Sequence, residues 1–201
     1  MSTKTAYLFD LDGTITRAEI LPLIARCAGI EEEIATLTQA TIAGVIPFQK
    51  SFRLRVALLR DVPVDTITEA VREVPLYGQI VDFIRSNREN SFVVTGNLDV
   101  WVSPLIEAMG CRSYASRGSL TSSGGVTLDH ILDKSQAVAD IRRDFDRVVS
   151  IGDGMGDVPM FEVSDLTVAF GATHDPVDSL LEYANYVCFR EDSLCHLLTQ
   201  L

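Results

Sequence analysis

Two carboxylates near the N-terminus, Asp10 and Asp12, stand two positions apart directly after the apolar run Tyr7–Phe9. Because alternate side chains of an extended chain point to the same side, both acids can face one reacting centre. One carboxylate can then attack phosphorus while its neighbour handles the proton of the leaving oxygen. The alternative is a strand end followed by an Asx-type turn at Asp12 and Gly13, without a catalytic role.

A second acidic cluster occupies a similar position later in the chain. The segment Gly152–Asp157 reads Gly-Asp-Gly-Met-Gly-Asp and follows the apolar run Val148–Ile151. It therefore brings two more acids, Asp153 and Asp157, to the end of a second strand-like pattern. Two such clusters in one chain favour a shared reaction site over coincidence.

Two further polar positions lie between the acidic clusters. Thr95 and Gly96 end the buried-strand pattern that begins at Phe92, and Lys134 stands at the start of a helical pattern. A hydroxyl and an ammonium group can neutralise the oxygens of a phosphoryl group in transfer. The order of the motifs resembles that of the haloacid dehalogenase-like phosphohydrolase superfamily.

Strand-like and helical patterns mostly alternate along the chain, which is typical of a doubly wound, Rossmann-like α/β fold with a mostly parallel sheet. Apolar runs predict strands at 5–9, 91–95, 112–115, 147–151, 167–170 and 186–189. Helical periodicity predicts helices at 76–88, 98–109, 134–144, 155–163, 176–184 and 191–200. Residues 117–129 read as a hairpin. Because such sheets bind ligands at the carboxyl ends of their strands, Asp10, Thr95 and Asp153 should share one site.

The stretch 17–74 breaks this alternation, because it contains successive helical patterns with no strand between them. We expect it to form a helical cap inserted into a catalytic core of residues 1–16 and 75–201. The expected hinges lie at 16–18 and 74–78, where the chain leaves the core and returns to it. A cap on such hinges would open and close over the site.

The position of this insertion resembles the phosphoserine phosphatase branch of the superfamily. The resemblance implies that Glu19 receives a substrate ammonium group, since it matches a glutamate that follows the aspartate motif in that branch. The segment Phe48–Val56 resembles F-x-x-S-L-R-x-R-V, which implies that Arg55 holds a substrate carboxylate and that Phe48 closes the pocket. The plainer alternatives are a first-turn helix acid for Glu19 and a solvated basic side chain for Arg55.

Two positions depart from the pattern of those phosphatases. Gly96 and Asn97 stand where two glycines are usual, and Gly156 stands where the G-D-G-x-N-D motif carries an asparagine. We place Gly96 and Asn97 among the substrate-binding residues. Because these departures alter the floor of the pocket, another small phosphomonoester, such as a sugar phosphate, stays open beside phosphoserine.

The resemblance implies a magnesium-dependent phosphomonoester hydrolase that works through an aspartyl-phosphate. Asp10 would be the nucleophile and Asp12 the general acid and base. Thr95 and Lys134 would neutralise the phosphoryl oxygens. Oxygen ligands for Mg²⁺ would come from Asp10, the backbone carbonyl of Asp12, Asp153 and Asp157. Transfer to a small alcohol instead of water stays open, whereas a non-enzymatic binding protein is disfavoured because the catalytic positions keep competent side chains.

The 201-residue chain is 47% hydrophobic and carries a net charge of −11. Its composition suits a globular unit with a sizeable core, and its acidic balance argues against nucleic acid or an anionic membrane as a partner. A small phosphorylated metabolite is the expected partner. No apolar stretch approaches membrane-spanning length, and the short N-terminal run does not resemble a signal peptide, so we expect a cytoplasmic location. The sequence leaves the oligomeric state open.

Overall fold

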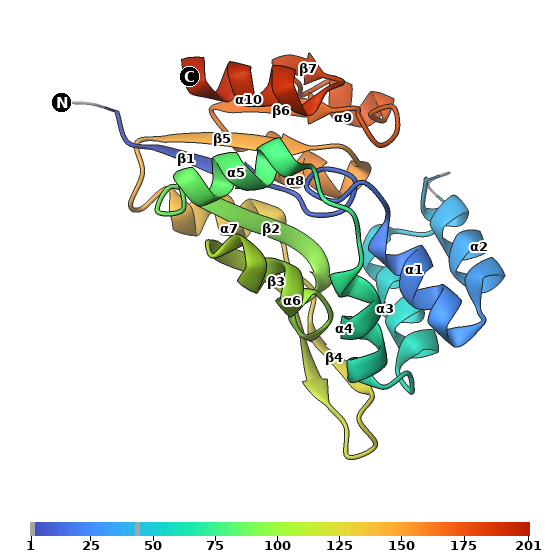
Figure 1. Ribbon diagram of the computed structural model, residues 1–201. Helices are drawn as coiled ribbons and strands as arrows, with labels where there is room; N and C mark the ends of the chain where they lie inside the picture. The colour runs from blue at the N-terminus through green and yellow to red at the C-terminus, as the bar shows by residue number, and fades with distance from the viewer. Residues whose placement is uncertain (1–2, 43–44) are drawn as a thin grey trace.

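A computed structural model describes residues 3–42 and 45–201 of the chain. Its strands form one sheet in the order β4-β3-β2-β1-β5-β6-β7, and every neighbouring pair except β3 and β4 is parallel (Figure 1). The strands are β1 Thr5–Phe9, β2 Ser91–Leu98, β3 Arg112–Leu120, β4 Val126–His130, β5 Arg147–Gly152, β6 Leu166–Phe170 and β7 Tyr186–Cys188. The predicted doubly wound α/β fold is confirmed.

The helices of the described residues fall into an inserted group and a group that packs on the sheet. The inserted helices are α1 Ile20–Ala28, α2 Glu31–Ile42, α3 Phe48–Leu59 and α4 Val64–Arg72. The others are α5 Gly78–Ser86, α6 Asp99–Met109, α7 Lys134–Ile141, the 3₁₀ turn η1 Met155–Asp157, α8 Val158–Phe161, α9 Asp178–Leu181 and α10 Glu191–Gln200. None of the helices described is long and apolar enough to cross a membrane.

Two predicted helices differ from the structure. The pattern at 155–163 is divided into η1 and α8, because Pro159 stands in the first turn of α8 and starts a new helix. The helix expected at 176–184 is only the short α9. The chain leaves α9 because Asn185 bonds to β6, where its side-chain oxygen accepts from the backbone N–H of Thr167 at 2.9 Å.

Side chains of β1 alternate between two apolar cores, as the pleat of a buried strand requires. Ala6 and Leu8 pack with residues of α7, α8 and α9 on one face of the sheet. Phe9 packs with residues of α5, α6 and α10 on the other face. Helices on both faces therefore leave the carboxyl ends of the strands as the place where polar side chains can gather.

The helices α1 to α4 follow one another between β1 and α5, and Figure 1 shows them grouped beyond the end at which β1 leaves the sheet. The chain enters and leaves this insertion side by side. Thr16 and Leu76 form an isolated antiparallel bridge, and the backbone N–H of Arg17 donates to the carbonyl of Pro75 at 2.7 Å. The two expected hinge segments are thus adjacent in space.

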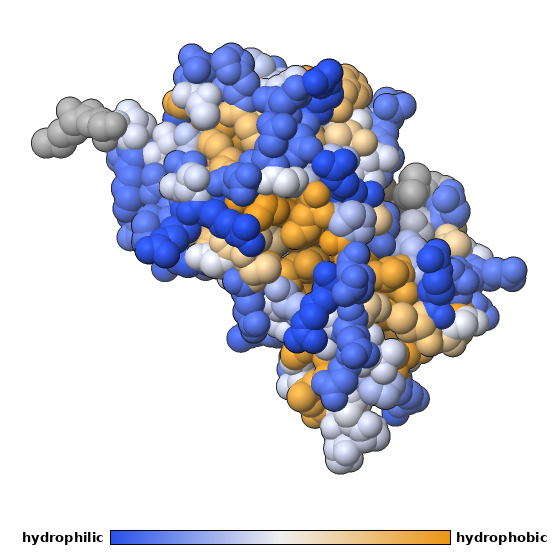
Figure 2. All heavy atoms as spheres, viewed as in Figure 1, coloured by the Kyte–Doolittle hydropathy of each residue, from blue (hydrophilic) through white to orange (hydrophobic). Residues whose placement is uncertain are grey.

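The insertion also packs against the rest of the molecule through apolar side chains. Ile67 and Val71 of α4 share one buried cluster with Trp101 and Val102 of α6. Figure 2 shows apolar side chains gathered on this face between the sheet and the inserted helices. The inserted helices are therefore held by apolar packing in addition to the paired chain segments.

The hairpin of β3 and β4 makes a further connection to the insertion. At its tip the carbonyl of Gly124 accepts from the N–H of Val64, at 2.9 Å. The N–H of Val126 donates to the carbonyl of Arg60 at 2.8 Å. These two bonds hold the loop between α3 and α4 against the hairpin, and α3 itself contacts β4.

Candidate active site

The two acidic motifs meet at one edge of the sheet. β1 and β5 are parallel neighbours with Phe9 opposite Ile151, so the residues that follow them emerge together. Asp10 continues the pairing, because its backbone N–H donates to the carbonyl of Ile151 at 2.9 Å. Asp10, Asp153 and Asp157 each offer a carboxylate oxygen, and these three atoms lie within 4.8 Å of one another. All three side chains are buried.

Lys134 lies among these carboxylates. It is the first residue of α7, whose N-terminus is capped by Asp133 through a 2.9 Å bond from the N–H of Ser135. The buried Nζ of Lys134 donates to Asp10 and, at 2.6 Å, to Asp157. Burial alone would lower the pKa of Lys134, but the two carboxylates raise it above its ordinary value. The group therefore stays cationic beside the candidate nucleophile.

Asp157 also shapes the loop that carries Asp153. Its Oδ2 accepts from the backbone N–H of Asp153 at 3.0 Å and from that of Gly154 at 3.1 Å. A Cβ at position 152 would overlap the Asp157 carboxylate, so only glycine fits there. Gly152 is thus needed to let the loop turn back onto the carboxylate of Asp157.

Negative charge exceeds positive charge in this cluster. Burial and the carboxylates of Asp157 and Asp153 raise the pKa of Asp10 well above its ordinary value. Burial also raises the pKa of Asp153 to about 6, against an opposing hydrogen bond from His174. A group of buried, all-oxygen carboxylate ligands fits a hard divalent cation, which would offset this repulsion.

Both carboxylate oxygens of Asp12 accept a hydrogen bond. The N–H of Ile20, at the start of α1, donates to Oδ1 at 2.8 Å. The side-chain Nδ2 of Asn97 donates to Oδ2. Burial, followed by the nearby charge of Glu19, raises the pKa of Asp12 to about 8. This partly buried acid therefore has the environment of a proton donor at neutral pH.

Thr95 and Gly96 lie where β2 changes register against β3. The pairing is irregular between Thr95 and Leu98, so the chain bulges at Gly96 and Asn97. Thr95 is fully buried, and its hydroxyl accepts from the N–H of Asn97 at 3.1 Å. A Cβ at Gly96 would approach the ring of Phe48 to 3.2 Å. The glycine thus lets a helix of the insertion lie close over the end of β2.

Phe48 and Arg55 approach the same region from α3. The Phe48 ring stacks on Phe52 with their centroids 5.8 Å apart, and Arg55 lies 5.8 Å from the Phe48 ring centre. Arg55 is 6% exposed, and in the described part of the chain its Nε has no hydrogen-bond partner. Burial lowers the pKa of Arg55, and the carboxylates of Asp12 and Glu19 oppose that shift. Arg55 is therefore a buried donor available at the acidic site.

His174 joins the site although the sequence reasoning did not place it there. Its Nε2 lies 2.6 Å from an oxygen of Asp153 and 3.4 Å from an oxygen of Glu19. Hydrogen bonds to these two carboxylates raise the pKa of His174 to about 11. The position of His174 in the loop after β6 could have indicated this contact. Because β6 pairs in parallel with β5, the loops that follow these two strands emerge at the same edge of the sheet.

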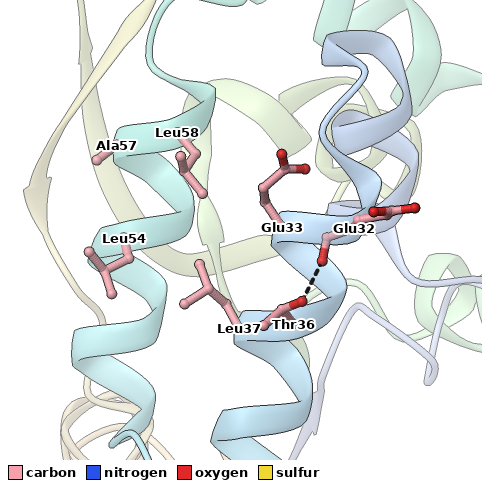
Figure 3. Close-up of a pocket in the computed structure, with 7 residues that line it drawn as sticks. All are labelled: Glu32, Glu33, Thr36, Leu37, Leu54, Ala57 and Leu58. Atoms are coloured by element: carbon pink, nitrogen blue, oxygen red, sulfur yellow. Dashed lines mark hydrogen bonds between the residues drawn. The ribbon is translucent and has the colours of Figure 1, made fainter.

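A hollow of about 610 Å³ lies elsewhere, between α2 and α3 (Figure 3). It is lined by Glu32, Glu33, Thr36, Leu37, Leu54, Ala57 and Leu58. Its lining holds none of the candidate catalytic residues. The candidate catalytic residues therefore lie at the acidic edge of the sheet, outside this groove of the insertion.

Several phosphoserine phosphatases are similar to this chain in sequence or in fold. The chain is 29% identical to a phosphoserine phosphatase of Methanocaldococcus jannaschii over 184 residues, covering 84% of this chain and 86% of the relative. It is also 29% identical to a phosphoserine phosphatase of Archaeoglobus fulgidus over 201 residues, covering 92% of this chain but 58% of that longer protein. A solved structure of a phospho-aspartyl intermediate analogue of phosphoserine phosphatase superposes with a TM-score of 0.80, at 27% identity and with both chains fully covered.

The family model described as haloacid dehalogenase-like hydrolase matches residues 7–162. This range runs from β1 through the second acidic loop to the end of α8, and so includes both acidic motifs, the inserted helices and Lys134. On this match the chain belongs to the haloacid dehalogenase-like hydrolases.

Proposed function

We propose that this protein is a magnesium-dependent phosphomonoester hydrolase that works through an aspartyl-phosphate, with phosphoserine as its leading substrate. The observation that carries the proposal is the buried contact of Asp10 with Lys134, beside two further carboxylates at the same sheet edge. The names of the similar phosphatases support the same chemistry and substrate.

Asp10 acts as the nucleophile. Lys134 keeps its positive charge beside Asp10. This charge stabilises the ionised carboxylate of Asp10 and also attracts the negatively charged phosphoryl group of a substrate. As the oxygen of Asp10 bonds to phosphorus, the bond from phosphorus to the substrate alkoxide breaks. Lys134 and Thr95 would neutralise the negative charge that spreads over the remaining phosphoryl oxygens.

Asp12 serves the proton transfers of both steps. It gives its proton to the leaving alkoxide and later takes a proton from the water that attacks the aspartyl-phosphate. This second displacement releases inorganic phosphate and restores the Asp10 carboxylate. The bonds from Ile20 and Asn97 support the role, because they fix the direction in which the Asp12 carboxylate points.

The metal in this proposal is Mg²⁺, held by oxygen ligands from Asp10, the backbone carbonyl of Asp12, Asp153 and Asp157. The mutual repulsion of the buried carboxylates supports the fit. When bound, Mg²⁺ would supply positive charge against the phosphoryl oxygens. The protein's own part is to keep these ligands together, which Asp157 does through the Asp153 loop.

Substrate selection is assigned to the inserted helices and the loop before them. Glu19 offers a carboxylate to a substrate ammonium group, and Arg55 offers a buried guanidinium to a substrate carboxylate. Phe48 covers the bulge at Gly96 and Asn97, where the substrate carbon chain would lie. This combination favours a phosphorylated amino acid.

One observation favours another small phosphomonoester, such as a sugar phosphate. His174 lies 3.4 Å from Glu19, so a cation of the chain already faces the carboxylate that would receive the ammonium group. Transfer of the phosphoryl group to a small alcohol differs only in the acceptor that replaces water.

We also propose that residues 17–74 form a cap that moves on the paired segments 16–18 and 74–78, with 1–16 and 75–201 as the core. The ranges 1–16 and 17–74 include residues 1–2 and 43–44, which lie outside the described residues. The side-by-side entry and exit of the insertion supports this division.

A cytoplasmic location is proposed as well, since the four cysteines are free thiols, one of them exposed.

The test is phosphate release with Mg²⁺ from phosphoserine, phosphoethanolamine, phosphoglycolate and several sugar phosphates, by wild type and Glu19→Gln. We expect phosphoserine to be preferred over phosphoglycolate by about thirty- to a thousandfold in kcat/KM, because an unpaired charge would remain in the pocket. Glu19→Gln should remove most of that preference. Equal rates on the two substrates, insensitive to Glu19→Gln, would show that no ammonium group is recognised.

A further inference from the structure

Asn97 makes a contact that reaches the candidate proton donor directly. It lies in the bulge of β2, is 4% exposed, and donates through Nδ2 to Oδ2 of Asp12. The other carboxylate oxygen of Asp12 accepts from the backbone N–H of Ile20, 2.8 Å away. Two donors from different elements, β2 and α1, therefore determine how the Asp12 carboxylate is turned.

The backbone that carries Asn97 is itself fixed. The N–H of Asn97 donates to the hydroxyl of Thr95 at 3.1 Å, within the same bulge. The hydroxyl of Ser116, on β3, donates to the carbonyl of Gly96 at 2.7 Å and accepts from the N–H of Leu132 at 3.0 Å. A side chain on such a supported backbone can hold its partner in one orientation.

The side-chain oxygen of Asn97 indicates that this residue does more than stabilise the fold. Its Oδ1 is buried and has no hydrogen-bond partner among the described residues. Buried amide groups that serve the fold alone are normally satisfied at both atoms. With a glycine or an alanine at position 97, by contrast, the one donor left to the Asp12 carboxylate within the described part of the chain would be the backbone N–H of Ile20.

We propose that Asn97 is a positioning residue for Asp12, an inference that rests on the phosphatase function proposed above. By holding Oδ2, Asn97 directs the Asp12 carboxyl group toward the oxygen that leaves phosphorus. In the first step that oxygen takes the Asp12 proton as the Asp10–phosphorus bond forms. In the second step the same orientation lets Asp12 take a proton from the attacking water.

The test compares two substrates that differ in their need for a proton donor. An alkyl phosphate releases a strongly basic alkoxide, whereas p-nitrophenyl phosphate releases a nitrophenolate that leaves without protonation. Asn97→Leu keeps the volume of the side chain but removes the donor. We expect it to lower kcat/KM for the best alkyl phosphate by about ten- to a hundredfold, and for p-nitrophenyl phosphate by less than about threefold. Asn97→Ala is the second variant, should Asn97→Leu not give folded protein.

Ser116→Ala is the matched control, because it loosens the same bulge without removing a contact of Asp12. It should change the two substrates by similar factors. Equal losses on both substrates with the Asn97 variants, or the same selective loss with Ser116→Ala, would overturn the positioning role.

Failure of the proposed function is separable from this result. If wild type releases no phosphate from either substrate with Mg²⁺, or if Asp10→Asn keeps its turnover of both, the covalent phosphatase mechanism is wrong. Loss of turnover in Asp10→Asn, combined with no selective effect at Asn97, would reject only the role of Asn97.

Discussion

The sheet edge and the inserted helices form the two sides of the site by different means. On the sheet side, Asp10, Lys134 and Asp157 are buried and joined by direct contacts. On the inserted side, Phe48 is 38% exposed and the Nε of Arg55 has no partner within the described residues. The charged groups of the sheet side therefore already contact one another, whereas on the inserted side the partly exposed ring of Phe48 and the Nε of Arg55 are left for a substrate to contact. We therefore expect loss of the nucleophile or of the metal to reduce turnover of every substrate, and changes on the inserted side to alter selectivity.

The largest effect is expected at the nucleophile. Asp10→Asn should lower kcat by at least about a thousandfold, because positioning by the remaining groups does not replace a covalent step. The fold should persist, since the substitution removes one charge from a crowded group of carboxylates. Phosphate release and thermal unfolding of the purified variant check both points. Near wild-type turnover in Asp10→Asn would break the contrast between the two sides.

Removal of the metal should have the next largest effect. Chelation with EDTA should lower phosphate release by at least about a hundredfold, and added Mg²⁺ should restore it. Asp153→Asn should raise the Mg²⁺ concentration needed for half-maximal activity by at least about tenfold, as measured by titration. The exposed Asp144→Asn is the control and should titrate like wild type. Full activity in EDTA would contradict the assignment of the carboxylates as metal ligands.

A smaller and selective effect is expected on the inserted side. Arg55→Ala should lower kcat/KM for phosphoserine by about ten- to a hundredfold, because a substrate carboxylate would lose its charged donor. Phosphoethanolamine, which has no carboxylate, should be affected much less. Arg53→Ala is the matched control, since Arg53 is exposed on the same helix α3. An equal loss of kcat/KM for both substrates would mean that Arg55 supports the fold of α3 and does not bind the substrate carboxylate.

The smallest effect concerns motion of the insertion against the core. Mg²⁺ with beryllium fluoride, an analogue of the phosphoryl group, should slow hydrogen exchange at residues 16–18 and 74–78 as the site closes. Amides of β1 should exchange at the same rate with and without the analogue. Unchanged exchange at both hinge segments, with the analogue shown to be bound, would indicate that the apolar contact of α4 with α6 holds the insertion in place.

The arrangement on the sheet side could be predicted from sequence to a large extent. Asp10 and Asp153 follow strand-like runs, and parallel neighbours bring such residues to one edge of the sheet. The start of the helix at Lys134 was also predicted, and Asp133 caps it in the structure. The contact of Lys134 with Asp10 was less accessible, because it joins residues 124 positions apart.

Two contacts of the site were not predicted from the sequence. His174 reaches Asp153 only because the loop after β6 folds over its neighbouring strand, and no motif spacing indicates this approach. Asn97 was placed among the substrate-binding residues, but its amide contact with Asp12 depends on the register change in β2. Both contacts join residues more than 20 positions apart through irregular backbone, which local patterns do not encode.

The most direct test of the account is chemical trapping of the covalent intermediate. Reduction with borohydride during turnover, in the presence of Mg²⁺ and the best substrate, should convert the acyl phosphate at position 10 to homoserine. Peptide mass spectrometry should find this change at Asp10, and omission of the substrate should abolish it. Continued turnover with no modification of Asp10, or with the modification at another carboxylate, would contradict the aspartyl-phosphate mechanism.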